Sequence, residues 1–489
     1  MPTQKTHSFT VCLFLLKKMF FYDNINISFI QRDKDIMNNR TITAIATPLG
    51  DGALGVIRIS GDKAIEIADK VFFPFSKKEL CDFEGYQAAY GEVKENDTVL
   101  DDAVALVFRA PHSFTGEDTV EISLHGGSLM LKSVLRLILK NGAFLAEAGE
   151  FTKRAFLNGK TDLTKAESIM GLISAKSNAE LKLSRAAHTG RTFKKIAKIE
   201  SDLISADASI AAFSDYPDED IEGLNAENFS KMLSNAKQEL REMLSTFDAG
   251  KVLREGIDTV IVGKPNVGKS TLMNMLSGTE RSIVTEIAGT TRDVIEETVT
   301  IGEITLRLAD TAGIHKTDDT VESIGVERAK QRIDTAQLCL AVFDCTSQLD
   351  EEDLNLLKLL NRENTIIIIN KTDLENKIDY SAFEGFRIVE ASAKNSVGYK
   401  ELEKQITEIS GTANLSAESV VLMNERQRDC AIRALDGVEE ALNALNIGLT
   451  MDAVGVCVDD ALSALFEMTG KRVTNAVTDE IFRKFCVGK

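Results

Sequence analysis

The chain has 489 residues, of which 44% are hydrophobic and 27% charged, a composition typical of a folded globular protein and not of a disordered or fibrous one. At roughly 100–200 residues per domain, this length predicts two to four domains. The net charge of −18 excludes a uniformly basic nucleic-acid-binding surface, and seven cysteines without a CxxC pair argue against a disulfide framework or a structural zinc site.

Residues 1–40 do not share the pattern of the rest of the chain. Their apolar run at 9–16 is followed, not preceded, by Lys17 and Lys18, which does not fit a secretory signal. It is also shorter than the roughly 20 apolar residues that a membrane span needs. Two explanations remain, a genuine extension or anchor and upstream sequence translated from a wrong start, and we favour the second, with Met37 as the true start.

Residues 41–160 are predicted to form an α+β domain. β-Prone runs bounded by Gly, Asp or Pro predict strands at 41–47, 55–60, 87–93, 103–108 and 119–124. The stretch 129–142 predicts a helix that stops at Asn141-Gly142. A GxGxxG pattern at 50–55 precedes a predicted strand and not a helix, so we reject a dinucleotide-binding site there.

Residues 161–250 change to helical periodicity, and SDYPDED at 214–220 is their only strong interruption, so we expect two or more long helices. The segment 181–198 carries six basic residues and no acidic one. On a helix, Arg191, Lys194, Lys195 and Lys198 share one face, which is the best candidate for contacting RNA phosphates. A solvated helix face explains the same pattern at least equally well.

Residues 251–410 alternate between short β-branched runs and helical stretches. The runs predict strands at 260–263, 304–310, 338–344, 365–370 and 387–393. This alternation indicates a parallel-type sheet with helices on both faces. Residues 411–489 return to a helical pattern like that of 161–250, so the α/β zone is expected to be inserted into one helical domain.

The sequence GKPNVGKS at 263–270 fits the phosphate-loop pattern GxxxxGK[ST], and it follows a predicted strand and opens a predicted helix. Backbone N–H groups of such a loop face phosphates, while the Lys adds a cation and the Ser hydroxyl holds Mg²⁺. We therefore predict nucleotide contacts from Asn266, Val267, Gly268, Lys269, Ser270 and Thr271.

Three further motifs follow at successive strand ends, and together with the phosphate loop they predict a GTPase. They are Asp310-Thr311-Ala312-Gly313, Asn370-Lys371-Thr372-Asp373 and Ser392-Ala393-Lys394. The Asp of the second motif can accept both N–H donors of a guanine edge, which adenine does not supply, so ATP is the poorer fit. Many GTPases carry a water-orienting Gln just after the first motif. Here that position is Ile314, so another group must position the water.

The phosphate loop, TEIAGTTRD at 285–293, DTAG, NKTD and the terminal CVGK at 486–489 together resemble the MnmE (TrmE) family of tRNA-modification GTPases. VIRISG, FTGEDTVEISLHGG and EFTKRAFLNGKTDLTKAE in the first half resemble the same family. The resemblance spans 41–489 and implies a multidomain α/β protein. Its parts would be an N-terminal α+β tetrahydrofolate-binding and dimerisation domain (41–160), a discontinuous helical domain (161–250 and 411–489) and an inserted Ras-like P-loop GTPase domain (251–410).

The resemblance also implies roles at the catalytic centre. K⁺ would replace an arginine finger, held by Asn266, Thr285, Ile287 and Thr290, while Mg²⁺ would be held by Ser270 and Thr291. Glu322 would orient the attacking water through a second water, although from the residues alone an exposed acid at a helix start is preferred. The loop over the nucleotide would contribute Thr285, Glu286, Ile287, Ala288, Gly289, Thr290 and Thr291.

For the first domain, the resemblance implies a site for 5-formyl- or 5,10-methylene-tetrahydrofolate, contacted by Arg58, Glu121, Lys160 and Lys489. Cations there suit the glutamate tail and a carboxylate suits the pterin N–H donors. Surface ion pairing is the alternative for Arg58, Glu121 and Lys160, and the sequence alone favours it. Cys486 is a catalytic candidate whose alternative is a free thiol in a frayed tail.

The function that the resemblance implies is a K⁺-activated, cytoplasmic GTPase without membrane attachment that hydrolyses GTP when the G domains of a homodimer meet. With the FAD-dependent partner MnmG (GidA), in a heterotetramer or larger complex, it would install a 5-carboxymethylaminomethyl- or aminomethyl-type group on the tRNA wobble uridine. A ribosome-assembly RNA-binding GTPase is the alternative, but the second G domain or KH-like loop that such relatives usually carry does not follow residue 410. The second alternative is a folate-dependent methyl-group enzyme that carries a regulatory GTPase.

Overall fold

The structure is a computed structural model that describes residues 40–50, 52–175, 177–215, 226–277, 297–308, 332–415 and 419–489. The described residues fall into two compact units. One takes those within 1–170, 188–241 and 425–489, and the other takes those within 171–187 and 242–424.

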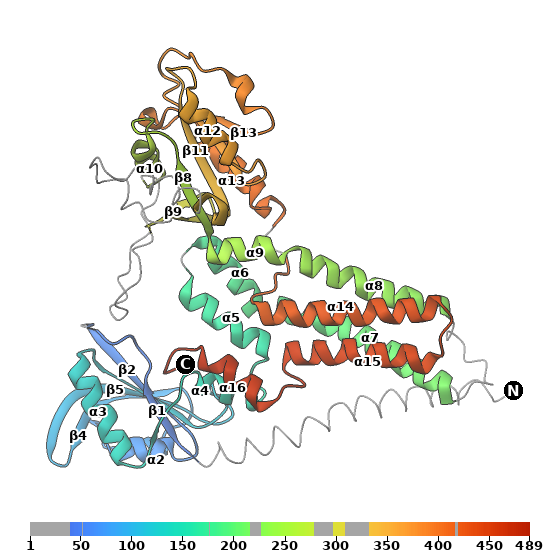
Figure 1. The fold of residues 1–489 in the computed structure, drawn as a ribbon. Coiled ribbons are helices and arrows are strands. Elements are labelled where there is room, and N and C mark those ends of the chain that lie inside the picture. Colours follow the sequence, from blue (N-terminus) through green and yellow to red (C-terminus); the bar gives the residue numbers. More distant parts are fainter. Residues whose placement is uncertain are drawn as a thin grey trace. The chain divides into compact units, whose positions relative to one another are not determined.

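The amino-terminal part of the first unit is built on a seven-stranded sheet with the order β3-β4-β5-β6-β2-β1-β7. Figure 1 draws this part in shades of blue, with β1, β2, β4 and β5 labelled. Its strands are β1 (Ile42–Ile45), β2 (Leu54–Ser60), β3 (Phe72–Pro74), β4 (Gln87–Glu95), β5 (Thr98–Phe108), β6 (Thr119–His125) and β7 (Phe144–Leu145). Neighbours are antiparallel except β1 and β7. All five strands predicted for this region are present, whereas β3 and β7 are too short to show an alternating pattern.

Strand alternation decides which face of this sheet is the core. Ile57 and Ile59 of β2 are fully buried and pack in one cluster with Leu131 and Val134 of α3 (Ser128–Lys140), the predicted helix. Burying side chains of this kind is worth about 1.5–3 kcal/mol each. Arg58, between the two isoleucines, therefore points to the opposite face. The remaining helices of this part are α2 (Ala64–Asp69), η1 (Leu80–Asp82) and α4 (Glu150–Leu157).

Long helices come before and after the α/β zone, and most of α6 with the ends of α5 and α8 belongs to the second unit. The helices before and after the zone are α5 (Leu163–Ser174), α6 (Asn178–His188), α7 (Arg191–Asp215), α8 (Ala226–Ser245), α14 (Glu425–Asn446), α15 (Met451–Thr469) and α16 (Asn475–Arg483). Helices α7, α14 and α15 lie side by side (Figure 1). A Cβ on Gly437 of α14 would lie 3.0 Å from the Cys457 carbonyl oxygen of α15, so glycine permits their close approach. The predicted discontinuous helical domain is confirmed.

The second unit holds a six-stranded sheet with the order β13-β12-β11-β8-β10-β9. Its strands are β8 (Ile257–Val262), β9 (Glu297–Ile301), β10 (Ile304–Leu308), β11 (Leu338–Asp344), β12 (Thr365–Asn370) and β13 (Arg387–Glu390). The five predicted strands are parallel, as expected. The edge strand β9 was not among the strands predicted and runs antiparallel to β10. The two-residue turn that joins them uses Gly302 at a φ of 59°, which favours glycine.

Helices cover both faces of this sheet, as predicted. In β12, Ile366 and Ile368 belong to the cluster that includes α10 (Lys269–Ser277) and α13 (Tyr399–Ile409), while Ile367 and Ile369 face α12 (Glu351–Leu359). The remaining helices are α9 (Phe247–Glu255), η3 (Tyr380–Phe383), η4 (Ala393–Asn395) and η5 (Thr412–Asn414). Across the described ranges, no helix is both long enough and apolar enough to cross a membrane.

Candidate functional site

The predicted phosphate loop lies between β8 and α10, in the strand–turn–helix context expected of it. Gly263 has a φ of 143° and Gly268 a φ of 102°, both in the region that favours glycine. A Cβ on Gly268 would lie 2.1 Å from Nδ2 of Asn370, and one on Gly263 would lie 2.4 Å from the Val342 carbonyl oxygen. The loop is therefore folded so closely against the neighbouring strand ends that a larger residue does not fit at either position.

Lys269, the first residue of α10, turns its ammonium group toward the loop. Its Nζ donates to the carbonyl oxygens of Gly263 at 2.6 Å and Lys264 at 2.7 Å. Burial lowers the pKa of Lys269, because its charged form loses water. Phosphate oxygens accept hydrogen bonds from an ammonium more strongly than carbonyl oxygens do. The loop thus combines a cation with the N–H groups at a helix start, which is the chemistry that binds phosphate.

Asn370 joins the phosphate loop to two motifs that lie far from it in the sequence. Its Nδ2 donates to the Val267 carbonyl oxygen at 2.8 Å, and its Oδ1 accepts from the Ala393 backbone N–H at 3.0 Å. Ser392 donates from Oγ to Oδ1 of Asp373 at 2.6 Å, and this bond lowers the pKa of the Asp373 carboxyl group. The structure therefore brings together the predicted residues of these motifs, with an ionised carboxylate available for a guanine edge.

We call the segment Asn370–Asp373 the guanine loop, after its predicted ligand, and the sequence analysis missed two residues that contact it. At the end of β11, Asp344 and Cys345 both bond to Lys371. The signal that could have revealed them is the polar run Asp344-Cys345-Thr346, which directly follows an apolar strand in a parallel sheet. The carboxyl ends of such strands gather at one edge, so polar residues there are candidates for a shared site.

Several predicted site residues lie outside the described residues, and their roles stay predictions. They are Thr285, Glu286, Ile287, Ala288, Gly289, Thr290, Thr291, Asp310, Thr311, Ala312, Gly313 and Glu322.

Arg58 and Glu121, predicted to contact folate, are cross-strand partners on the sheet face opposite α3. Nε and Nη2 of Arg58 lie 2.8 and 2.7 Å from Oε1 of Glu121. The guanidinium also lies over the rings of Phe114 and Phe151, at 5.7 and 5.5 Å from their centroids. Arg58 and Glu121 therefore do form the ion pair that was raised as the alternative to folate binding. Lys160 is not part of that pair, and its Nζ donates to the Pro111 carbonyl oxygen at 2.9 Å.

The carboxyl-terminal tail is seated on the first domain rather than frayed. Arg58 donates from Nη1 to the Gly488 carbonyl oxygen at 3.2 Å, and the Gly149 N–H donates to that of Cys486 at 3.4 Å. A Cβ on Gly488 would lie 2.5 Å from the Ile45 carbonyl oxygen. This places Cys486, an exposed free thiol, and Lys489 in the part of the fold that contains Arg58.

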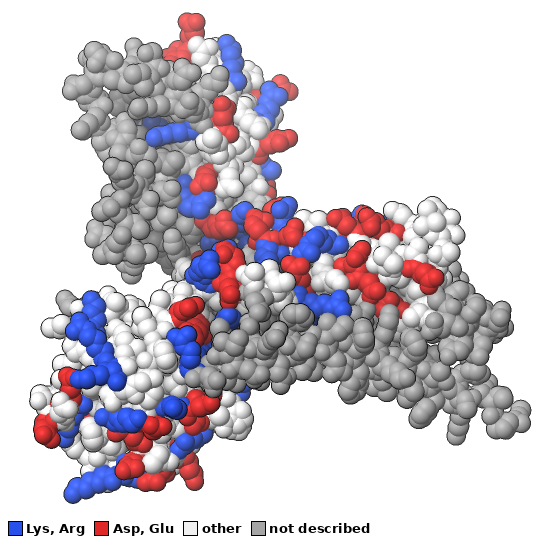
Figure 2. Space-filling view, turned by 60° about the horizontal axis from the view of Figure 1, so that its bottom comes forward, with Lys and Arg blue, Asp and Glu red and all other residues white. Residues whose placement is uncertain are grey.

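The basic segment 181–198 is partly neutralised by carboxylates. In α7, Lys195 and Lys198 pair with Glu239 of α8 at 3.4 and 2.7 Å. Acidic and basic side chains are interspersed over the described residues on the face seen in Figure 2. These contacts favour the solvated-face interpretation of the segment over a dedicated phosphate-binding surface.

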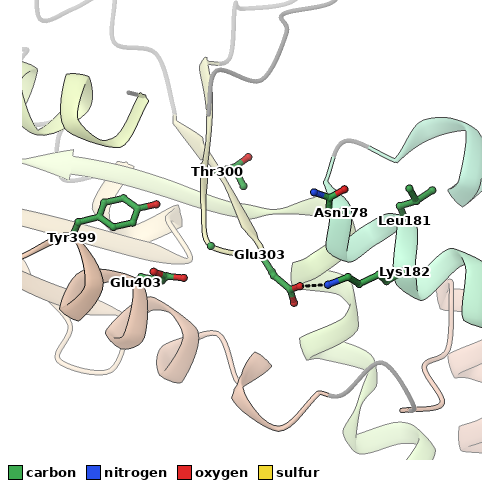
Figure 3. Close-up of a pocket in the computed structure, with 8 residues that line it drawn as sticks. Asn178, Leu181, Lys182, Thr300, Glu303, Tyr399 and Glu403 are labelled. Atoms are coloured by element: carbon green, nitrogen blue, oxygen red, sulfur yellow. Dashed lines mark hydrogen bonds and ion pairs between the residues drawn. The ribbon is translucent and has the colours of Figure 1, made fainter. Parts of the chain in front are cut away.

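A cavity of about 520 Å³ in the second unit is lined by residues of α6, α13 and the β9–β10 hairpin (Figure 3). Lys182 and Glu303 pair across it at 2.5 Å. Both side chains are more than half exposed, so this pair is worth about 0–1 kcal/mol. Of the predicted nucleotide and metal ligands that the structure describes, none lines this cavity.

Two family profiles match the chain. The one described as "GTP-binding protein TrmE N-terminus" matches residues 41–160, and the one described as "MnmE helical domain" matches residues 163–486.

Curated relatives match nearly the full length. The tRNA modification GTPase MnmE of Acetivibrio thermocellus is 42% identical over 457 residues, which cover 92% of this chain and 99% of the relative. That of Clostridioides difficile is 39% identical over 454 residues, covering 92% and 99%. Among solved structures, the FeoB G-domain from Methanococcus jannaschii is 24% identical with a TM-score of 0.24, covering 32% of this chain and 98% of that one.

Proposed function

The chain belongs to the MnmE family of tRNA modification GTPases, and from that premise we propose that it hydrolyses GTP to modify the wobble uridine of certain tRNAs. The observation that carries the GTPase part is the pair of bonds by which Asn370, the first residue of the guanine loop, contacts both the phosphate loop and the Ser392-Ala393-Lys394 motif. The uridine product is a 5-carboxymethylaminomethyl- or aminomethyl-type group. Its addition involves an FAD-dependent partner, MnmG, in a heterotetramer or larger cytoplasmic complex with a homodimer of this chain.

The residues of the phosphate loop suit a magnesium–nucleotide complex. Ser270 is exposed at the start of α10 and offers a hydroxyl oxygen, a ligand type that Mg²⁺ accepts. Thr291 would be the second protein ligand of Mg²⁺, and Lys269 would bind the phosphates of the nucleotide. Mg²⁺, when bound, neutralises charge on the phosphate oxygens. Asp373 reads guanine, while Glu322 orients the attacking water because Ile314 cannot donate or accept a hydrogen bond there.

Asn266 fits a role as a K⁺ ligand. It is exposed in the phosphate loop at a φ of 64°, and its neutral side-chain amide offers an oxygen, the ligand type that hard cations take. Thr285, Ile287 and Thr290 would complete the set, and K⁺ would supply the positive charge that other GTPases obtain from an arginine finger. We infer that the set closes only when two G domains of the homodimer meet.

GTP hydrolysis is therefore expected to run faster in K⁺ than in Na⁺, by roughly tenfold or more, since charge neutralisation at this position is worth 10³–10⁵ in related enzymes. Turnover measured in matched KCl and NaCl at equal ionic strength checks this. Asn266→Ala should abolish the difference between the salts. Equal rates for the unaltered protein would remove Asn266 from its proposed role.

Arg58 and Glu121 fit a folate ligand with an acidic tail and a flat heteroaromatic head. The guanidinium is a partner for a carboxylate, Glu121 is an acceptor for ring N–H groups, and Phe114 offers an exposed ring beside them. Lys160 and Lys489 would add further cations. The bound folate supplies a one-carbon unit, and Cys486 would lie beside it.

Arg58→Ala is expected to weaken binding of 5-formyltetrahydrofolate roughly tenfold to hundredfold, because a charge-assisted hydrogen bond is lost. Isothermal titration of the full-length protein measures this. Lys140→Ala, which breaks an exposed ion pair with Glu95 in the same domain, is the control and should bind folate normally. Unchanged affinity in Arg58→Ala would contradict the folate site.

Nucleoside mass analysis of tRNA from cells that lack this chain tests the function as a whole. We expect the wobble uridine to lose its C5 substituent and to regain it when the chain is restored. Normal wobble uridine together with accumulated ribosomal precursors would support the ribosome-assembly alternative. Normal wobble uridine together with saturable folate binding would instead support a folate-dependent methyl-group enzyme with a regulatory GTPase.

A further inference from the structure

Two residues at the carboxyl end of β11 stand beside the point where β12 leaves the sheet. The parallel register pairs Asp344 with Asn370, and the Cys345 N–H donates to the Asn370 carbonyl oxygen at 3.0 Å. The next residue after Asn370 is Lys371, so Asp344, the last residue of β11, and Cys345, which follows it, lie beside the start of the guanine loop.

Lys371 has a left-handed backbone with a φ of 66°, a conformation that costs free energy for any residue with a Cβ. Such a residue persists only where its surroundings hold it. Its Nζ lies 2.5 Å from Oδ2 of Asp344, and its carbonyl oxygen accepts from Sγ of Cys345 at 3.1 Å. The same carbonyl accepts from the Leu374 N–H at 2.9 Å. The β11 end therefore holds Lys371 at both its side chain and its backbone.

The protonation states of the Asp344 carboxyl group and the Cys345 thiol suit this task. Burial opposes ionisation of Asp344, but hydrogen bonds from Lys371 and Thr346 outweigh it and lower the pKa of the carboxyl group. Thr346 donates from its backbone N–H at 2.9 Å and from Oγ1 at 2.8 Å, which fixes the carboxylate. Burial raises the pKa of the Cys345 thiol, so the thiol keeps the proton that it donates.

We propose that Asp344 and Cys345 are positioning residues for guanine recognition: they hold Lys371 in its left-handed conformation and thereby set where Asp373 meets the base. The inference deepens the proposed function and rests on it. On the other side of the loop, the Thr372 N–H donates to the Ala391 carbonyl oxygen at 3.1 Å and Ser392 holds Asp373. The loop is thus held from the ends of β11 and β13, and loss of the Asp344 and Cys345 side-chain contacts removes the support of Lys371 from the β11 end.

The same contacts could serve stability alone, and the two roles differ in what they change. If the pair only stabilises the fold, its loss lowers the melting temperature and leaves the nucleotide preference of the folded protein intact. If the pair positions the loop, its loss weakens guanine binding and narrows the preference for GDP over IDP, since inosine lacks the 2-amino donor. In that case turnover at saturating GTP changes less than affinity does.

Asp344→Asn removes the charge at nearly constant volume. We expect its GDP dissociation constant to rise roughly tenfold and its preference for GDP over IDP to narrow. Its kcat at saturating GTP should stay within about twofold of that of the unaltered protein, while its KM for GTP rises. Cys345→Ala should raise the GDP dissociation constant roughly threefold, and Cys345→Ser, which restores a donor, should recover most of it. Fluorescent-nucleotide displacement with GDP and IDP on the full chain gives these values.

Asp258→Asn is the matched control, because Asp258 pairs with Arg307 at 2.9 Å at the other end of the same sheet, and its GDP and IDP affinities should equal those of the unaltered protein. An Asp344→Asn variant that folds and retains normal GDP and IDP affinities overturns the proposal. If that variant does not fold, a Cys345→Ala variant with unchanged affinities overturns it instead. Failure of the proposed function is distinct: the unaltered chain would then bind ADP as tightly as GDP.

Discussion

Glu322→Ala is expected to bind GTP normally and to lose turnover by roughly a hundredfold or more, the scale of a group that positions or deprotonates an attacking water. The physical reason is the side chain that follows DTAG: Ile314 offers no donor or acceptor, so the water must be oriented by another polar group. We expect nucleotide affinity to depend on the phosphate loop and the guanine loop, which this change leaves in place. Single-turnover hydrolysis and fluorescent-GDP titration separate the two quantities.

Glu327→Ala is the matched control for that experiment, because it removes a carboxylate five residues away in the same segment. It should hydrolyse GTP at the rate of the unaltered protein. A Glu322→Ala variant with normal kcat would refute the assignment of Glu322. A variant that loses GDP binding as well would also refute it, since the residue would then act on affinity and not on the water.

Asp373→Asn is expected to weaken GTP binding by roughly a hundredfold or more and to shift preference toward xanthosine nucleotides. A site built to accept two N–H donors leaves buried polar groups unpaired when one partner changes, and such mismatches cost 10⁴–10⁵ in the strongest cases. The Asn side chain offers an N–H donor where Asp offers only acceptors, and xanthine has a carbonyl oxygen at the matching position. Competitive displacement of fluorescent GDP by GDP and by XDP measures the switch.

Asp379→Asn provides the comparison, since Asp379 lies six residues further on and its carboxylate accepts from the Ser381 N–H at 2.9 Å. Its preference for GDP should not change. If Asp373→Asn keeps the GDP preference of the unaltered chain, the guanine edge is read by other groups and the NKTD assignment is wrong.

The strands of the second unit were predictable because their local pattern is strong. Ile366 to Ile369 are four consecutive β-branched residues, and alternation sends them to two different cores once helices cover both faces. The edge strand β9 was harder to predict, because its pairing depends on the hairpin turn at Gly302 rather than on a long apolar run. In the first unit, β3 and β7 were missed for lack of length.

The candidate site also has a part that could be predicted from the sequence and a part that could not. The expectation that Lys269 binds phosphate and Asp373 binds guanine came from short motifs, because each motif's chemistry resides in residues that are close in the sequence. That Asn370 bonds to Val267, 103 positions away, could not be predicted from spacing. The contacts of Asp344 and Cys345 with Lys371 could not be found from a motif either.

Residue order alone was sufficient to predict the family, through the resemblance of its motifs. It was also sufficient to predict the phosphate and guanine motifs and most regular elements, because hydrophobic periodicity and loop chemistry act over a few neighbouring residues. Folding was needed to decide which strand ends become neighbours, and with them the pairing of Arg58 with Glu121, the seating of the tail on Ile45 and the support of Lys371. Strand order arises from packing between distant segments, and no local pattern encodes it.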